Sequence, residues 1–244
     1  MKRLRTQVST GLKRVYFIRH GQSEANAKLS DTILERDAKL TSLGQAQASC
    51  WNEENHLEKT FGDSQPEICF CSPLRRAMET ACLVFKNEPK IPIECSRFPR
   101  ERWWLHYQCV GEQFAETIKF AKTMPREVDS LDGLRVVDKY WNPEQELEEA
   151  NAYVGDDGIR KEGTGKYVES LREQEAQGIS RFVQQLQEHD AQSIAVACHW
   201  GTIFALTGAS PSNCDMLVTD MNVESGEFQV VAQLAPPGNV EKSV

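Results

Sequence analysis

Arg19 and His20 directly follow a run of apolar residues and precede Gly21, in the stretch VYFIRHGQSEAN at 15–26. This pattern predicts a buried strand that ends in an arginine and a histidine, turns at the glycine and leads into a helix. Such a strand end gathers positive charge, backbone N–H donors and one imidazole nucleophile. Together these groups can hold a phosphoryl group and attack it.

Two further apolar runs end in residues with related chemistry. The run ICFC at 68–71 is followed by SPLRRA, which places Arg76 in the first turns of a helix. The run IAVAC at 194–198 is followed by His199, with Gly201 two residues later. Because ligands bind beyond the carboxyl ends of parallel strands, we expect two arginines and two histidines to converge at one edge of a sheet.

The elements that must position these residues alternate along the chain. Strands are expected at 15–19, 68–71, 91–95, 194–198, about 215–219 and about 227–233, the last two forming a hairpin. Helices are expected from a Thr41 cap to about Leu57, after a Ser72 cap with Pro73 at the first helical position, and over 166–189. This alternation predicts a three-layer α/β/α sandwich with a mostly parallel central sheet.

The length and composition suggest one domain with two atypical segments. A chain of 244 residues can bury one sizeable core, and we expect a single domain over 15–244. Residues 1–14 carry five basic residues and no acid, so we expect a flexible basic arm there; whether it is a targeting signal stays open. Residues 100–165 hold a tryptophan pair, an acidic stretch and several glycines, and we expect an inserted lid that sets substrate choice.

Charge, hydropathy and cysteine spacing exclude several classes of function. The net charge of −8 predicts no broad basic field, so we expect no nucleic-acid partner. No apolar run has the length of a membrane span and no signal-peptide core is present, so we expect no membrane partner and a cytoplasmic location. The eight cysteines show neither CxxC nor zinc-like spacing, so we expect reduced core thiols and no bound metal.

Several stretches together resemble a known family. They are RHGQSEAN at 19–26, DAKLTSLGQAQA at 37–48, CSPLRRAMETA at 71–81 and VACHWG at 196–201, with ESLREQ at 169–174. The chain thereby resembles the histidine phosphatase superfamily, in its phosphoglycerate mutase-like branch (branch 1). The similarity frames most of residues 14–210, whereas 102–165 match poorly. It implies a phosphoglycerate mutase-like fold and phosphoryl chemistry without a cofactor.

The resemblance also implies roles for individual residues. It assigns His20 as the nucleophile that becomes phosphorylated and places His199 against the transferring phosphoryl group. The family's phosphate contacts fall on Arg19, Ser23, Asn26 and Arg76. Arginine suits this task because its planar fork meets phosphate oxygens in pairs and stays charged. Fixed arginines that supply this charge make a metal ion unnecessary.

The leaving group needs a proton, which the family takes from an acidic residue in the loop after the third strand. The best match is Glu101, in the stretch FPRERWW at 98–104. We expect neighbouring arginines to favour its ionised form and Trp103 and Trp104 to bury it. Glu112, in VGEQ, is the rival for this role.

We expect a phosphomonoesterase that acts on a small phosphorylated molecule or a phosphoprotein. Two alternatives stay open: phosphoglycerate mutase-type phosphoryl transfer, and a non-catalytic binding protein on the same scaffold. The chain lacks the extended motifs that the mutases carry around the first histidine and in the acid loop, which favours hydrolysis. Trp200 replaces the family's usual glycine after the second histidine and is expected to narrow the pocket. The sequence does not predict the oligomeric state.

Overall fold

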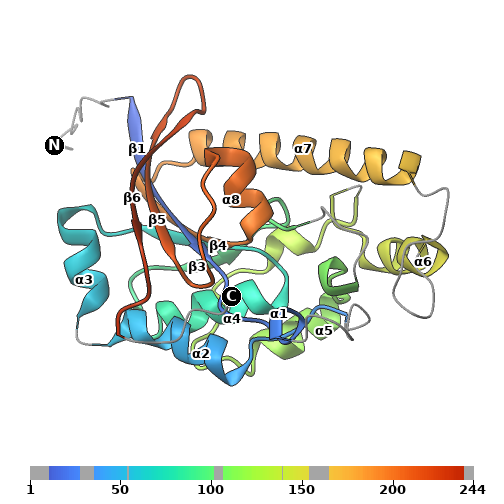
Figure 1. Ribbon diagram of the computed structural model, residues 1–244, viewed down its shortest axis with the longest axis horizontal. Coiled ribbons are helices and arrows are strands. Elements are labelled where there is room, and N and C mark those ends of the chain that lie inside the picture. The colour runs from blue at the N-terminus through green and yellow to red at the C-terminus, as the bar shows by residue number, and fades with distance from the viewer. Residues whose placement is uncertain are drawn as a thin grey trace, which may run out of the picture.

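A central sheet organises the molecule in the computed structural model, which describes residues 11–27, 36–53, 55–101, 107–138, 140–153 and 165–238 (Figure 1). Its six strands among these residues are β1 (Leu12–Arg19), β2 (Ile68–Cys71), β3 (Ile93–Cys95), β4 (Ser193–Cys198), β5 (Met216–Asn222) and β6 (Phe228–Leu234). Their order is β3-β2-β4-β1-β5-β6. The first four strands in that order pair in parallel, and β5 and β6 pair antiparallel. The predicted, mostly parallel sheet is confirmed.

Helices cover both faces of this sheet (Figure 1). They are α1 (Glu24–Ala27), α2 (Ser42–Ser49), α3 (His56–Phe61), α4 (Arg75–Val84), α5 (Phe114–Ala121), α6 (Pro143–Tyr153), α7 (Gly165–Glu188) and α8 (Trp200–Thr207). Alternate residues of β1 belong to different cores. Tyr16 and Ile18 pack with residues of α2, α3 and α4, whereas Phe17 packs with Phe182 of α7 and Ile203 of α8. The three-layer α/β/α sandwich predicted from the sequence is therefore confirmed.

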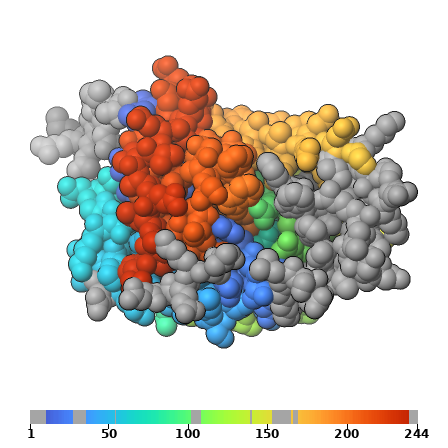
Figure 2. Space-filling model, in the orientation of Figure 1, coloured from blue at the N-terminus to red at the C-terminus, as the bar shows by residue number. Residues whose placement is uncertain are grey.

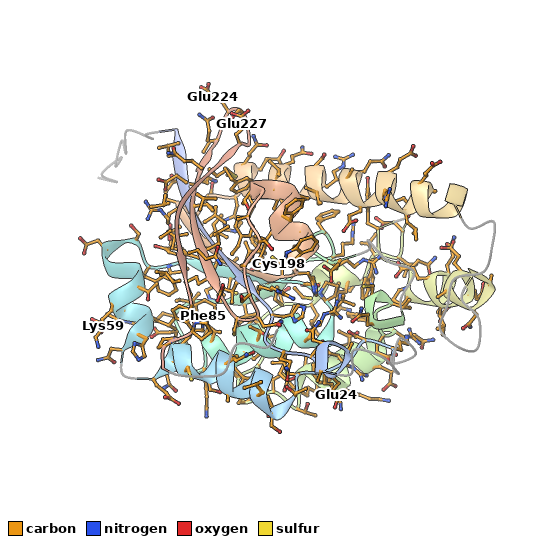
Figure 3. All side chains as sticks on the ribbon, viewed as in Figure 1. Glu24, Lys59, Phe85, Cys198, Glu224 and Glu227 are labelled. Carbon is orange, nitrogen blue, oxygen red and sulfur yellow. The ribbon has the colours of Figure 1, made fainter. Side chains whose placement is uncertain are left out.

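The pairing register places the carboxyl ends of three strands side by side. Arg19 of β1 lies opposite Cys198 of β4, and Cys71 of β2 lies opposite Ala197 of β4. The bonds continue just beyond the strands, where the His20 amide donates to the Cys198 carbonyl at 3.0 Å. Figure 3 shows Cys198 in the interior of the molecule. The residues that follow these strands consequently meet at one buried edge.

The first strand begins earlier than predicted. β1 starts at Leu12 rather than at 15, so residues 12–14 of the predicted arm lie in the sheet; residues 1–10 lie outside the described residues. Lys13 is only 4% exposed, and its ammonium donates to the carbonyls of Leu186 at 2.9 Å and Gln187 at 3.1 Å. These carbonyls belong to the last turn of α7, where cations are favoured. The basic residue that suggested a solvated arm is thus a buried partner of a helix end.

The helix predicted from Thr41 to about Leu57 is interrupted. Its cap is confirmed, because the Gly44 amide donates to the Thr41 hydroxyl at 3.1 Å. α2 nevertheless ends at Ser49 and is followed by a 3₁₀ turn, Cys50–Asn52. Trp51 is buried and its indole N–H donates to the Cys214 carbonyl at 2.9 Å. This tertiary bond redirects the chain before α3 begins.

The segment predicted to be a lid over 100–165 contains α5, α6 and a 3₁₀ turn, Asp132–Leu134. The segment lies beside β3, the strand at one edge of the sheet, since the Cys95 amide donates to the Ser130 carbonyl at 2.8 Å. Trp141 is 1% exposed and belongs to the hydrophobic core that also contains Met78 and Ala81 of α4. α8 and the β5–β6 hairpin form the orange and red surface of Figure 2.

None of the described helices combines the length and apolarity needed to cross a membrane.

Candidate active site

The imidazole of His20 stands at the end of β1 with a defined tautomer. Its Nδ1 lies 2.7 Å from the Gly21 carbonyl oxygen. A carbonyl oxygen only accepts, so Nδ1 carries the hydrogen and Nε2 carries the lone pair. The pKa of His20 is lowered well below its ordinary value by burial and then by the charges of Arg76 and Arg19. At neutral pH the ring is therefore uncharged, with a lone pair on Nε2 that could act as a nucleophile.

The turn after His20 requires a glycine. A Cβ on Gly21 would lie 2.5 Å from the Gly44 carbonyl oxygen, so a side chain there would displace the start of α2. The Gly21 amide donates to the Thr80 hydroxyl of α4 at 3.1 Å. Asn213 holds the same turn from the other side, because its side-chain amide donates to the His20 carbonyl at 2.9 Å. These contacts fix the nucleophile between α4 and the loop before β5.

Arg76 of α4 contacts the nitrogen of His20 that carries the lone pair. Its Nε donates to Nε2 of His20 at 3.2 Å, and its Nη1 donates to the Gln108 carbonyl at 2.6 Å. Its Nη2 lies 3.5 Å from a carboxylate oxygen of Glu101. The guanidinium is 1% exposed, so water screens its charge poorly. A buried guanidinium in this position could hold an anionic group against Nε2 of His20.

The start of α4 differs from the prediction. The helix begins at Arg75 with Leu74 as its N-cap, so the predicted Ser72 cap and Pro73 first position are wrong. The Ser72 hydroxyl instead lies 2.7 Å from Nε2 of His199. The orphan amide of Arg75 is satisfied by Asp37, whose carboxylate accepts it at 2.8 Å. Burial raises the pKa of Asp37 to about 7.

His199 follows β4 and faces His20, with the two ring centroids 5.1 Å apart. Its Nδ1 is buried, has no hydrogen-bond partner among the described residues, and lies 4.0 Å from Glu101. Burial, followed by the charges of Arg76 and His20, lowers the pKa of His199 well below its ordinary value. One ring nitrogen is thus held by Ser72 while the other points into the site without a partner.

Glu101 contacts the residues at this edge, whereas its rival pairs with two other arginines. One Glu101 carboxylate oxygen accepts the Gly201 amide, in the first turn of α8, at 3.0 Å. The other is the oxygen close to Arg76 and His199. The ion pairs found for Glu112 in the described part of the chain are with Arg36 and Arg75, each at 3.5 Å. Trp103 and Trp104, expected to bury Glu101, lie outside the described residues.

The remaining residues predicted to contact phosphate differ in which of their hydrogen-bond donors are available to an anion. Nη1 of Arg19 donates to the Pro211 carbonyl at 2.9 Å, and its buried Nε has no partner among the described residues. Ser23 is fully buried, and its hydroxyl donates to Oδ1 of Asn26 at 3.0 Å while accepting the Asn26 amide at 3.2 Å. This reciprocal cap begins α1. It uses Oδ1 of Asn26 and leaves the side-chain NH₂ as the group that can donate to an anion.

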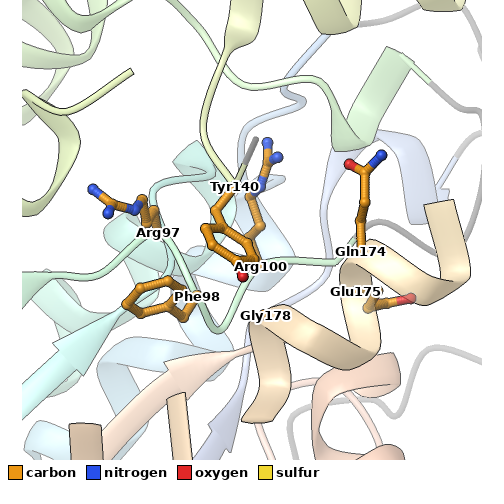
Figure 4. A pocket seen from close by; sticks show the side chains of 7 residues that line it. All are labelled: Arg97, Phe98, Arg100, Tyr140, Gln174, Glu175 and Gly178. Atoms are coloured by element: carbon orange, nitrogen blue, oxygen red, sulfur yellow. The ribbon is translucent and has the colours of Figure 1, made fainter. Parts of the chain in front are cut away.

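A buried ion pair holds the residue before Glu101. The Arg100 guanidinium donates to both carboxylate oxygens of Glu146 in α6, one of them at 2.6 Å, and lies 5.0 Å above the ring of Trp141. Figure 4 shows Arg100 beside Tyr140, Glu175 and Gly178, which line the same small pocket. α6 therefore anchors the loop that carries the candidate acid.

Sequence reasoning missed several of these supporting residues. They are Asp37, Ser72 in its contact with His199, Thr80, Arg100, Glu146 and Asn213. Asp37 and Thr80 lie inside the family-like stretches and could have been noticed there. The stretch around Asn213 carries no signal of this kind.

Donor atoms of His20, Glu101 and His199 lie within 4.8 Å of one another, so these three residues could also hold a metal ion.

Comparisons with known proteins concern the family and the fold of the chain. Residues 15–130 match the model of the histidine phosphatase superfamily (branch 1). A phosphoglycerate mutase from Bacillus anthracis strain Sterne superposes with a TM-score of 0.53 at 16% identity, covering 91% of this chain and 92% of its own. A mycobacterial glucosyl-3-phosphoglycerate phosphatase reaches 0.50 at 18% identity, covering 91% and 99%. An Escherichia coli K-12 protein assigned as an alpha-ribazole-5'-P phosphatase reaches 0.50 at 19%, covering 92% and 98%.

None of the curated proteins shows a significant sequence match to this chain. At identities below one fifth, the three solved structures share the fold with it. They include both a mutase and phosphatases, so the likeness does not distinguish the two reactions.

Proposed function

We propose that this chain, which belongs to branch 1 of the histidine phosphatase superfamily, is a metal-independent phosphomonoesterase that works through a phosphohistidine on His20. One observation carries the proposal. The hydrogen bond from Nδ1 to the Gly21 carbonyl fixes the lone pair on Nε2, which points at the guanidinium of Arg76. A neutral nucleophile facing a buried cation suits attack on a dianionic phosphoryl group.

In the first step, Nε2 of His20 attacks phosphorus and the bond from phosphorus to the ester oxygen breaks. Arg76 releases its bond to Nε2 and, with Arg19, holds the equatorial oxygens, because both guanidiniums have donors at this edge. Protonated Glu101 gives its proton to the departing alkoxide. His199 donates to the phosphoryl group through Nδ1, with its Nε2 accepting from the Ser72 hydroxyl.

In the second step, water attacks phosphorus and the bond from phosphorus to Nε2 breaks. The Glu101 carboxylate takes the proton from this water, which returns it to the protonated form. Inorganic phosphate leaves and His20 is again neutral. Asn26 adds its side-chain amide to the phosphate contacts; Ser23 supports it through the cap of α1.

Hydrolysis is proposed ahead of mutase transfer because the sequence lacks the mutases' extended motifs. The substrate class is a small phosphorylated molecule or a phosphoprotein, and the segment over 100–165 is proposed to select it. The chain's acidic balance, with a net charge of −8, supports neither nucleic acid nor a membrane surface as a partner. A cytoplasmic location is proposed as well, and the eight free cysteines support it.

Labelling tests the covalent step. Protein incubated with p-nitrophenyl phosphate that carries ³²P, then denatured without acid, should hold acid-labile phosphate on His20. His20→Ala should lose both the label and turnover, whereas His56→Ala should keep them. Turnover retained by His20→Ala would contradict the mechanism. Interconversion of phosphoglycerates without phosphate release would indicate the mutase, and no turnover of any phosphomonoester or phosphopeptide would indicate a binding protein.

A further inference from the structure

Three potential metal ligands meet where the phosphoryl group is proposed to bind. One ring nitrogen of His20, one of His199 and one carboxylate oxygen of Glu101 lie within 4.8 Å of one another. Two imidazoles and one carboxylate form a donor set that zinc takes in proteins, with the fourth position open to water. We propose that these residues bind Zn²⁺ and that the bound ion reversibly blocks the site by occupying Nε2 of His20.

The lone pair of His20 is already directed into the trio. Nδ1 carries the ring hydrogen, because it lies 2.7 Å from the Gly21 carbonyl oxygen. Nε2 is consequently the ligand atom, and no change of tautomer is needed. The bond from Nδ1 to a backbone carbonyl is also the kind of outer contact that orients metal-binding histidines.

His199 can present a lone pair because its partner is a hydroxyl. Ser72 lies 2.7 Å from Nε2 of His199, and its hydroxyl can either donate to this nitrogen or accept from it. When Ser72 accepts, the hydrogen lies on Nε2 and Nδ1 has the lone pair. That Nδ1 is fully buried and has no partner in the part of the chain that the structure describes. A change of the His199 tautomer, in which Nδ1 loses its hydrogen to water and Nε2 gains one, together with rotation of the Ser72 hydroxyl, thus converts a phosphoryl donor into a metal ligand.

Two features make the site weaker than a structural zinc site. A tetrahedral ion with zinc–nitrogen bonds of about 2.05 Å holds its ligand atoms about 3.3 Å apart. The 4.0 Å between Glu101 and Nδ1 of His199 therefore has to shorten, which rotation of the Glu101 side chain can achieve. Arg76 also has to release its 3.2 Å bond to Nε2 of His20, and its charge repels the cation. Binding should accordingly be reversible by chelators.

Direct titration of the metal-free protein with zinc chloride tests the site. Calorimetry should show one zinc per chain for the wild type. Glu101→Gln and His199→Ala each remove a ligand and should weaken binding by more than about tenfold, and Ser72→Ala should weaken it by about 10–100-fold through the orientation of His199.

Two other side chains that could bind zinc serve as matched controls. Cys50 is the least buried of the eight cysteines, and His56 lies in α3, away from the catalytic edge. Cys50→Ser and His56→Gln should bind zinc as the wild type does. If either control abolishes binding, or if Glu101→Gln and His199→Ala bind like the wild type, the assignment is overturned.

Inhibition is measured separately on the wild type. Hydrolysis of p-nitrophenyl phosphate should fall over the zinc concentrations that saturate the calorimetric site and return when a chelator is added. Zinc bound at the trio without inhibition would overturn the blocking role. Because binding is read directly, failure of the proposed phosphatase activity would leave the result on the metal site intact.

Discussion

The carboxyl edge of β1, β2 and β4 and the segment that contains α5 and α6 both contribute to the candidate site, but by different means. At the strand edge, residues adjacent in sequence to the strands supply the chemistry, as with His20 and His199. In the segment, the contribution passes through distant pairs, such as Arg100 with Glu146. The comparison teaches that one part of the site follows from local pattern and the other from tertiary contacts.

Glu101 links the two regions, and its replacement should have the largest effect. Glu101→Gln keeps the size of the side chain and removes its proton, which should slow hydrolysis of alkyl phosphates by about 10²–10⁴-fold. The loss should be small for p-nitrophenyl phosphate, whose leaving group departs as a stable anion. Steady-state kinetics with both substrates measures the difference.

Glu112→Gln is the matched control, because Glu112 pairs with Arg36 and Arg75 instead. It should retain wild-type kinetics with both substrates. If this variant shows the leaving-group-dependent loss and Glu101→Gln does not, the proton donor is Glu112.

Loss of the buried ion pair between Arg100 and Glu146 should mainly lower the stability of the protein. Glu146→Gln leaves the guanidinium of Arg100, which is 1% exposed, without a countercharge and should lower the free energy of unfolding by about 3–5 kcal/mol. Urea denaturation gives this value. Glu116→Gln breaks the exposed pair with Lys119 and should cost less than about 1 kcal/mol. Equal losses in the two variants would show that the buried pair does not anchor α6.

Replacement of Arg76, at the edge formed by the strand ends, should mainly lower the rate of hydrolysis. Arg76→Lys keeps the charge but loses the fork that reaches His20, Gln108 and Glu101 together. We expect kcat to fall by about 10²–10³-fold, as for removal of one oriented donor to a transition state. Thermal unfolding of the variant should stay close to that of the wild type; a variant that is unfolded at the assay temperature would show that Arg76 acts on folding.

Asp37, which accepts the first amide of α4, should produce an effect that depends on pH. Its pKa is about 7 in the folded protein and near 3.8 when exposed, so the folded state binds the proton more tightly. Its contribution to stability is present below about pH 4 and is lost as pH rises through 7. The free energy of unfolding should therefore fall between these values in the wild type relative to Asp37→Asn. Parallel pH profiles of the two proteins in urea denaturation would contradict this assignment.

Removal of metal ions should have the smallest effect. The proposed charge source is Arg19 with Arg76, so excess chelator should leave hydrolysis of p-nitrophenyl phosphate unchanged, or raise it if zinc had been bound. Loss of activity that only added magnesium restores would show that the strand edge does not supply the charge.

The accuracy of the sequence prediction follows the same division. The apolar runs before Arg19, Ser72 and His199 are local, so their strands and shared edge could be predicted. The bond from Trp51 to Cys214, which interrupts the expected helix, joins residues far apart in sequence and has no local pattern. The same holds for Asn213 on the His20 turn and for Glu146 on Arg100. The roles of the candidate residues in catalysis stay predictions.

The direction of β1 has a practical consequence for handling the protein. The strand runs from Leu12 to Arg19, so a group attached ahead of Gly11 joins the sheet at the end opposite to His20. At a rise of about 3.3 Å per residue, the two ends of this strand lie about 23 Å apart. A surface linkage at that end of the strand should therefore leave the candidate site open, so immobilised protein can be assayed directly.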